Sequence, residues 1–124
     1  MNLLPSLASS PLAHGSVRGR LVLVLLASLN SAWAQAAPER LVTIGGAVTE
    51  TVFALGAGEQ VVAVDSSSTF PQAAVERPKV GYARTLAAEG ILAMRPDHVL
   101  APLHAGPDMV FDQLRAAGVR VTRV

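Results

Sequence analysis

The chain has 124 residues, which is enough for one domain, and it carries ten basic and nine acidic side chains. It contains no cysteine, so a disulfide framework, a thiolate metal site and a thiol nucleophile are excluded. The sequence has no basic patch with interleaved aromatic residues, and it therefore predicts no binding to nucleic acid.

The first 34 residues have the pattern of a secretory signal peptide. Two arginines precede an apolar run of nine residues, 21–29, which is too short to span a bilayer of about 30 Å as a helix. An A-x-A cleavage site ends at Ala34, although a short membrane anchor or a buried helix is an alternative interpretation of this segment. We therefore predict export and a mature domain at 35–124 with a formal charge of 8 − 9 = −1.

The first elements of the predicted domain form a β-α-β unit. The β-branched run 41–44 predicts a buried strand, which two glycines end with a turn. Apolar residues then recur at helical spacing and predict a helix at 47–55. The apolar run 60–64 predicts a second strand that is covered on both faces, parallel to the first.

The second half of the domain continues the alternation of strands and helices. A polar loop, 65–69, follows the second strand, and a short segment at 72–76 has room for one or two helical turns. The remaining predicted elements are a helix at 86–94, a strand at 98–101, a helix at 108–117 and a strand at 119–124. This order predicts an α/β fold with a parallel sheet and helices on both faces. Because the last strand has no closing element after it, we expect a truncated domain.

Ligands bind at the carboxyl ends of the strands in sheets of this kind. Candidate residues at that edge are Ser66, after the second strand, and His104, after the third. The patterns of a nucleotide fingerprint, a P-loop and a serine-hydrolase elbow are absent from the sequence, so we predict no enzyme. Solvation of the loop is the alternative interpretation of the serines, and a lone histidine without a second spaced ligand does not define a zinc site.

The segment 80–84 holds the one tyrosine of the sequence, followed two residues later by an arginine. Gly81 frees the backbone before Tyr82, so a loop can present the ring. Tyr82 and Arg84 point the same way if the backbone there is extended. Tyrosinate is an axial ligand of haem iron, and a neighbouring guanidinium stabilises the ionised phenol. The alternative interpretation is an ordinary packed tyrosine beside a solvated arginine.

Three segments, 40–58, 61–71 and 80–97, together resemble the substrate-binding proteins of bacterial haem (hemin) ABC importers. The wider class includes cobalamin and ferric-siderophore binding proteins. That class shares the Leu-x-x-Glu-x-Ile-Leu-x-x-Arg-Pro-Asp pattern, which begins here at Leu86, whereas Val-Gly-Tyr-x-Arg belongs to the haem binders. The resemblance covers nearly the whole predicted mature domain.

The resemblance implies the N-terminal, Rossmann-like lobe of a two-lobe periplasmic binding protein that holds its ligand between the lobes. It implies Tyr82 as the ligand of the haem iron, Arg84 as its support, and Glu89 as the group that docks onto the permease. A simple partner of the helix dipole is the other interpretation of Glu89. Haem b is the implied transported ligand, delivered by a monomer in the periplasm to an ABC importer permease in the inner membrane.

The sequence leaves three alternatives to a haem-binding lobe. A ferric-siderophore or cobalamin binding protein of the same class has the same fold, although Tyr82 and Arg84 weigh against it. A Rossmann-type enzyme requires a nucleotide fingerprint or a catalytic set, and neither pattern occurs. The last alternative is a truncated fragment without a binding function.

Overall fold

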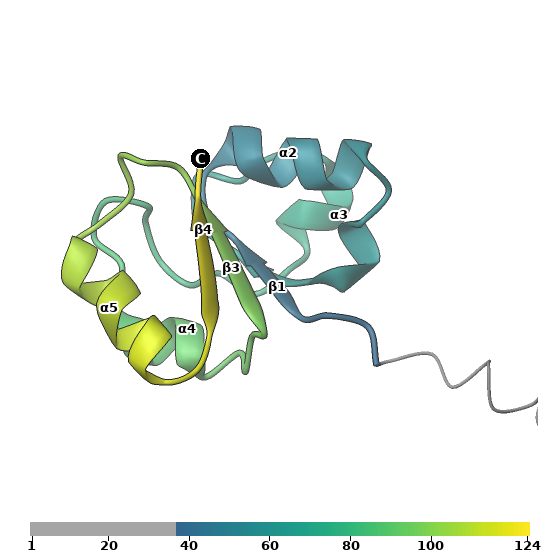
Figure 1. Cartoon of the computed structure of the whole chain (residues 1–124). Coiled ribbons are helices and arrows are strands. Elements are labelled where there is room, and N and C mark those ends of the chain that lie inside the picture. The colour runs from purple at the N-terminus through teal and green to yellow at the C-terminus, as the bar shows by residue number, and fades with distance from the viewer. Residues whose placement is uncertain (1–36) are drawn as a thin grey trace, which may run out of the picture. The chain divides into compact units, whose positions relative to one another are not determined.

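The computed structural model describes residues 37–124, and the signal peptide predicted for residues 1–34 lies outside them. The described residues form a four-stranded parallel sheet in the order β2-β1-β3-β4 (Figure 1). The strands are β1 (Leu41–Thr43), β2 (Val61–Val64), β3 (His98–Ala101) and β4 (Arg120–Arg123). The α/β fold with a parallel sheet, predicted from the alternation of elements, is confirmed.

Helices cover both faces of this sheet, with α2 and α3 on one side and α4 and α5 on the other (Figure 1). They span α2 (Gly46–Ala54), α3 (Gln72–Val75), α4 (Ala88–Leu92) and α5 (Asp108–Ala116), and a short 3-10 helix, η2 (Gly58–Gln60), precedes β2. Within the part of the chain that the structure describes, no helix is long and apolar enough to cross a membrane.

The sheet has two separate cores because successive side chains of a strand point to opposite faces. In β1, Leu41 packs toward α2 and α3, whereas Val42 packs toward α4 and α5. Phe111 and Ile91 are fully buried in the second of these cores. Burial on both faces explains why β2 is an apolar run without an alternating polar residue, whereas the edge strand β4 alternates exposed and half-buried side chains.

The helix predicted at 86–94 is wrong at both ends, since α4 covers only Ala88–Leu92. The backbone N–H of Leu86 donates to the carbonyl of Gly106 at 3.0 Å, and Ala87 is extended with φ −124° and ψ 132°. A bond to a distant loop has therefore replaced the first turn of the predicted helix. The other predicted elements agree with the structure to within one residue at each end.

Candidate functional site

Segments from four parts of the chain meet at the carboxyl edge of the sheet and line a hollow of about 300 Å³, which we call the carboxyl-edge hollow. Its lining includes Gly46 and Val48 at the start of α2, together with Ser67, Tyr82, Arg84 and His104. Three residues that the sequence singled out as candidates, Tyr82, Arg84 and His104, thus share one surface. The expected ligand edge of the sheet is where the hollow lies.

Tyr82 stands at the start of a tight turn. Gly81 adopts φ +105°, a conformation that side chains other than glycine rarely take, and the N–H of Thr85 donates to the carbonyl of Tyr82 at 2.9 Å. The extended backbone considered for Tyr82 and Arg84 is therefore not present, although both side chains line the carboxyl-edge hollow. Tyr82 is 50% exposed, so the residue is accessible to a ligand.

The segment before Tyr82 is held against the edge of β2. Lys79 forms an isolated parallel bridge with Val64, and the N–H of Val80 donates to the carbonyl of Val64 at 3.0 Å. One residue further along, the N–H of Ser66 donates to the carbonyl of Gly81 at 2.8 Å. The backbone that leads into Tyr82 is thereby fixed by a strand of the sheet and not by the ring itself.

A buried carboxylate, which the sequence did not single out, lies under this edge. Asp65 is fully buried and accepts hydrogen bonds from Gly45, Ser67 and Ser68. Burial alone raises the pKa of this carboxyl, but the hydroxyls of Ser67 and Ser68 and the N–H groups of Gly45 and Ser67 outweigh burial and lower the pKa below 3.8. Asp65 is therefore the ionised centre of a local network.

The serines of the loop 65–69 have different environments. The side chain of Ser66 is exposed and is not among the residues that line the carboxyl-edge hollow, whereas Ser67 lines it. Ser68 is fully buried and its hydroxyl lies 2.7 Å from that of Thr49, which lies 2.8 Å from that of Thr43. Loop solvation, the alternative considered for all the serines, is wrong for Ser68 because its hydroxyl is enclosed in this chain of hydrogen bonds.

His104 is exposed on the loop after β3, and Arg123 of β4 holds that loop in place. The Arg123 guanidinium donates to the carbonyls of Leu103 and Ala105 and lies 2.6 Å from a carboxylate oxygen of Asp108. Within residues 37–124, no group of three or more His, Asp or Glu side chains is placed to hold a metal ion. His104 thus contributes to the wall of the carboxyl-edge hollow as a single imidazole on a tethered loop.

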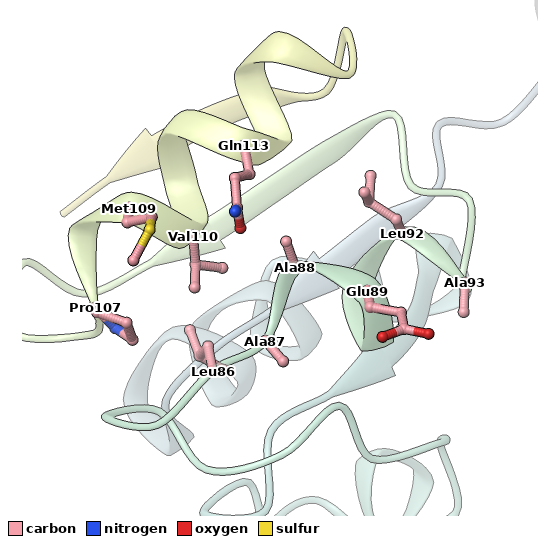
Figure 2. A pocket seen from close by; sticks show the side chains of 10 residues that line it. All are labelled: Leu86, Ala87, Ala88, Glu89, Leu92, Ala93, Pro107, Met109, Val110 and Gln113. Carbon is pink, nitrogen blue, oxygen red and sulfur yellow. The ribbon is translucent and has the colours of Figure 1, made fainter.

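Glu89 lies outside the carboxyl-edge hollow. It is an exposed residue in the first turn of α4 and lines a separate, open hollow of about 800 Å³, which we call the α4–α5 hollow. Figure 2 shows Val110 and Gln113 of α5 across from Ala88 of α4, with Glu89 on the α4 side. The lining is otherwise largely apolar, and exposed Met109 extends it along α5. The residues proposed for iron ligation and for docking therefore occupy two distinct surfaces.

The structure combines a parallel α/β sheet with a hollow at its carboxyl edge, the edge where ligands bind in open sheets of this kind. Residues 41–124 match the family described as "periplasmic binding protein", and the chain belongs to this family of binding proteins. It is 37% identical to the vitamin B12-binding protein of Yersinia pseudotuberculosis over 102 residues. The matched stretch covers 82% of this chain and 36% of that protein.

Solved structures of similar proteins have the same fold. The periplasmic haem-binding protein BhuT, solved with two haems, is 49% identical with a TM-score of 0.67, over 68% of this chain and 33% of that one. A periplasmic haem-binding protein from Pseudomonas aeruginosa is 48% identical with a TM-score of 0.68, over 71% of this chain and 32% of that one. The chain thus spans about a third of the length of the relatives it matches.

Proposed function

We propose that this chain binds haem in the periplasm, with Tyr82 as the ligand of the haem iron. The observation that carries the proposal is the half-exposed Tyr82 in one hollow with Arg84 and His104. Ferric iron favours the ionised phenol, and a guanidinium beside it stabilises the same charge. Tyrosinate ligation of haem iron is established chemistry in proteins. The resemblance to haem-binding proteins at 48 to 49% identity supports the same ligand.

The size of the carboxyl-edge hollow limits how much of a haem this lobe covers. Its volume of about 300 Å³ lies at the lower end of the range for small-molecule sites, which runs from about 300 to 1,000 Å³. Val48 and Pro102 provide apolar contact beside the phenol, while the rest of a porphyrin ring extends beyond the hollow. We therefore propose that Tyr82 anchors haem b at the iron and that this lobe covers one part of it.

Replacement of Tyr82 by phenylalanine tests the proposal directly. Tyr82→Phe keeps the ring and removes the ligand oxygen, so we expect hemin affinity to fall at least about tenfold, which is about 1.4 kcal/mol. Phe70→Ala is the matched control, because Phe70 is also an exposed aromatic residue but does not line the carboxyl-edge hollow. Equal hemin affinity of wild type and Tyr82→Phe in a spectrophotometric titration would refute the assignment.

Cobalamin is the second candidate ligand, because a vitamin B12-binding protein is 37% identical to this chain. Titration with cyanocobalamin and with hemin under the same conditions separates the two candidates, and a ferric siderophore serves as a third ligand. We expect hemin to bind most tightly. Saturable binding of cyanocobalamin that is unaffected by Tyr82→Phe would support the second candidate instead.

We further propose that the haem-loaded chain, a monomer exported by the signal peptide at 1–34, delivers haem to an ABC importer permease in the inner membrane. Glu89 is the proposed docking group, since its exposed carboxylate is available to a cation of the permease while the carboxyl-edge hollow holds ligand. Amino-terminal sequencing of the periplasmic protein tests the export step, and we expect the mature chain to begin at Gln35. A mature protein that retains residues 1–34 would contradict it.

A further inference from the structure

The carboxylate of Asp65 is buried, and within residues 37–124 no lysine or arginine forms an ion pair with it. Its charge is instead balanced by four hydrogen bonds. One oxygen, Oδ1, accepts from the N–H of Gly45 at 2.8 Å and the hydroxyl of Ser68 at 2.6 Å. The other, Oδ2, accepts from the N–H of Ser67 at 3.1 Å and from its hydroxyl at 2.5 Å. Such an arrangement is costly to break, since each buried donor left without a partner destabilises the fold.

The groups that Asp65 binds belong to the walls of the carboxyl-edge hollow. Gly45 is the N-cap of α2, and its neighbour Gly46 lines the hollow, as does Ser67. Between Asp65 and Ser67 in the chain, the N–H of Ser66 donates to the carbonyl of Gly81, the residue before Tyr82. A single carboxylate is therefore connected to the start of α2, to the loop after β2 and, through Ser66, to the tyrosine loop.

We propose that Asp65 is a positioning residue for the haem site: its carboxylate holds Gly45 and Ser67 together and thereby fixes Ser66, which anchors the loop that presents Tyr82. The inference rests on the proposed function, because it assigns Asp65 a role in the same site. Asp65 itself does not line the hollow and is not expected to contact the ligand.

Asparagine is an informative replacement because the two carboxylate oxygens have different backbone donors. Each of Oδ1 and Oδ2 accepts from one N–H, of Gly45 and of Ser67 respectively. An amide has one acceptor oxygen and one NH₂ group, so in either orientation its NH₂ faces one of these N–H donors. The hydroxyls of Ser67 and Ser68 can rotate to accept, but a backbone N–H cannot. Asp65→Asn must therefore release one wall of the hollow.

The matched control is Asp97→Asn. Asp97 also accepts a hydrogen bond from a backbone N–H, that of Arg40 at 2.8 Å, but it stands at the amino end of β3, away from the carboxyl-edge hollow. Both variants remove a carboxylate that binds backbone. Only Asp65→Asn is expected to change the site.

The experiment compares amide hydrogen exchange and hemin titration for the full chain and the two variants. In Asp65→Asn we expect selective loss of protection at Ser66, whose N–H is not bonded to Asp65, together with loss at whichever of Gly45 and Ser67 faces the new NH₂ group. We also expect about a tenfold loss of hemin affinity and a weaker tyrosinate absorption band. In Asp97→Asn, the protection of these amides, the hemin affinity and the tyrosinate absorption band should all match wild type. Unchanged protection at Ser66 and unchanged hemin affinity in Asp65→Asn would overturn the proposal.

The two readouts separate this inference from the proposed function. If wild type does not bind hemin, the proposed function fails, and the exchange pattern without ligand still decides whether Asp65 fixes Ser66. If Asp65→Asn does not fold, Ser68→Ala replaces it, because it removes the hydroxyl that shares Oδ1 with the N–H of Gly45 and thereby loosens the carboxylate at that oxygen. Loss of protection at Gly45 and Ser66 alone then supports the proposal, and a uniform loss across the sheet contradicts it.

Discussion

Tyr82 is available to a ligand because its backbone, and not its ring, carries the structural contacts. Gly81 and Ala83 accept hydrogen bonds from the N–H groups of Ser66 and Gly106, at 2.8 and 2.9 Å, on either side of the tyrosine. Ala83 is buried while Tyr82 is half exposed. Substitution of the phenol therefore changes the site with little effect on packing, which makes Tyr82→Phe a clean test of ligation.

Asp65 makes the free energy of unfolding depend on pH. Its pKa is lowered in the folded protein below the value of 3.8 that applies to the unfolded chain. Its contribution is therefore complete above that value and is lost as the pH falls through the folded pKa. We expect the stability difference between wild type and Asp65→Asn to shrink from pH 7 to about pH 3 in urea unfolding. A difference that stays constant or grows toward acid would contradict this.

The candidates at the residue scale were predictable to different degrees. Tyr82, Arg84 and His104 could be chosen from residue type and their place after strands, because exposed phenols, guanidiniums and imidazoles carry ligand chemistry wherever they lie. Asp65 could not, since a polar loop of serines after a strand has the composition of a solvated turn. Its hydrogen bond from the N–H of Gly45, twenty residues earlier, is a contact that no local pattern encodes.

At the scale of elements, α4 presents Glu89 beside the apolar α4–α5 hollow (Figure 2). If the chain delivers haem to an importer as proposed, we expect Glu89→Gln to reduce haem uptake by roughly two- to fivefold, since an exposed ion pair contributes up to about 1 kcal/mol. Hemin affinity should stay unchanged, because Glu89 does not line the carboxyl-edge hollow. Glu76→Gln, at the exposed end of α3, is the control for charge. Equal uptake by both variants would remove Glu89 from the docking surface.

Helix α5 has one buried and one exposed face, and the two should respond differently to truncation. Phe111 is fully buried and lies under the Arg123 guanidinium, 4.4 Å from the ring centroid, whereas Met109 is 63% exposed. We expect Phe111→Ala to lower the free energy of unfolding by about 3–5 kcal/mol and Met109→Ala by no more than about 0.5 kcal/mol. Urea unfolding measures both. Similar losses in the two variants would contradict the core described for α4 and α5.

The order of elements could be predicted because apolar periodicity and glycine positions are local signals. Gly118, with φ +86°, follows α5 as a glycine at a helix C-terminus does. The start of α4 could not be predicted, because the N–H of Leu86 donates to the carbonyl of Gly106, in a loop twenty residues later. The pairing of Lys79 with Val64 is a tertiary contact of the same kind and fixes the path into Tyr82.

At the scale of the whole molecule, residues 37–124 form a sheet with one core on each face, and the carboxyl-edge hollow lies where four segments converge. The chain spans about a third of the length of its relatives. The carboxyl-edge hollow correspondingly provides a tyrosine, a guanidinium and a tethered imidazole from one side. We therefore expect hemin binding to this lobe to depend strongly on the iron–ligand bond, with little compensation from enclosure of the ring.

The resonance Raman spectrum of the ferric haem complex tests this central claim most directly. The account predicts iron–tyrosinate vibrations in the wild-type spectrum and their loss in Tyr82→Phe. Histidine ligation that disappears in a His104→Ala variant but persists in Tyr82→Phe would contradict it, because the imidazole on the facing loop would then be the iron ligand.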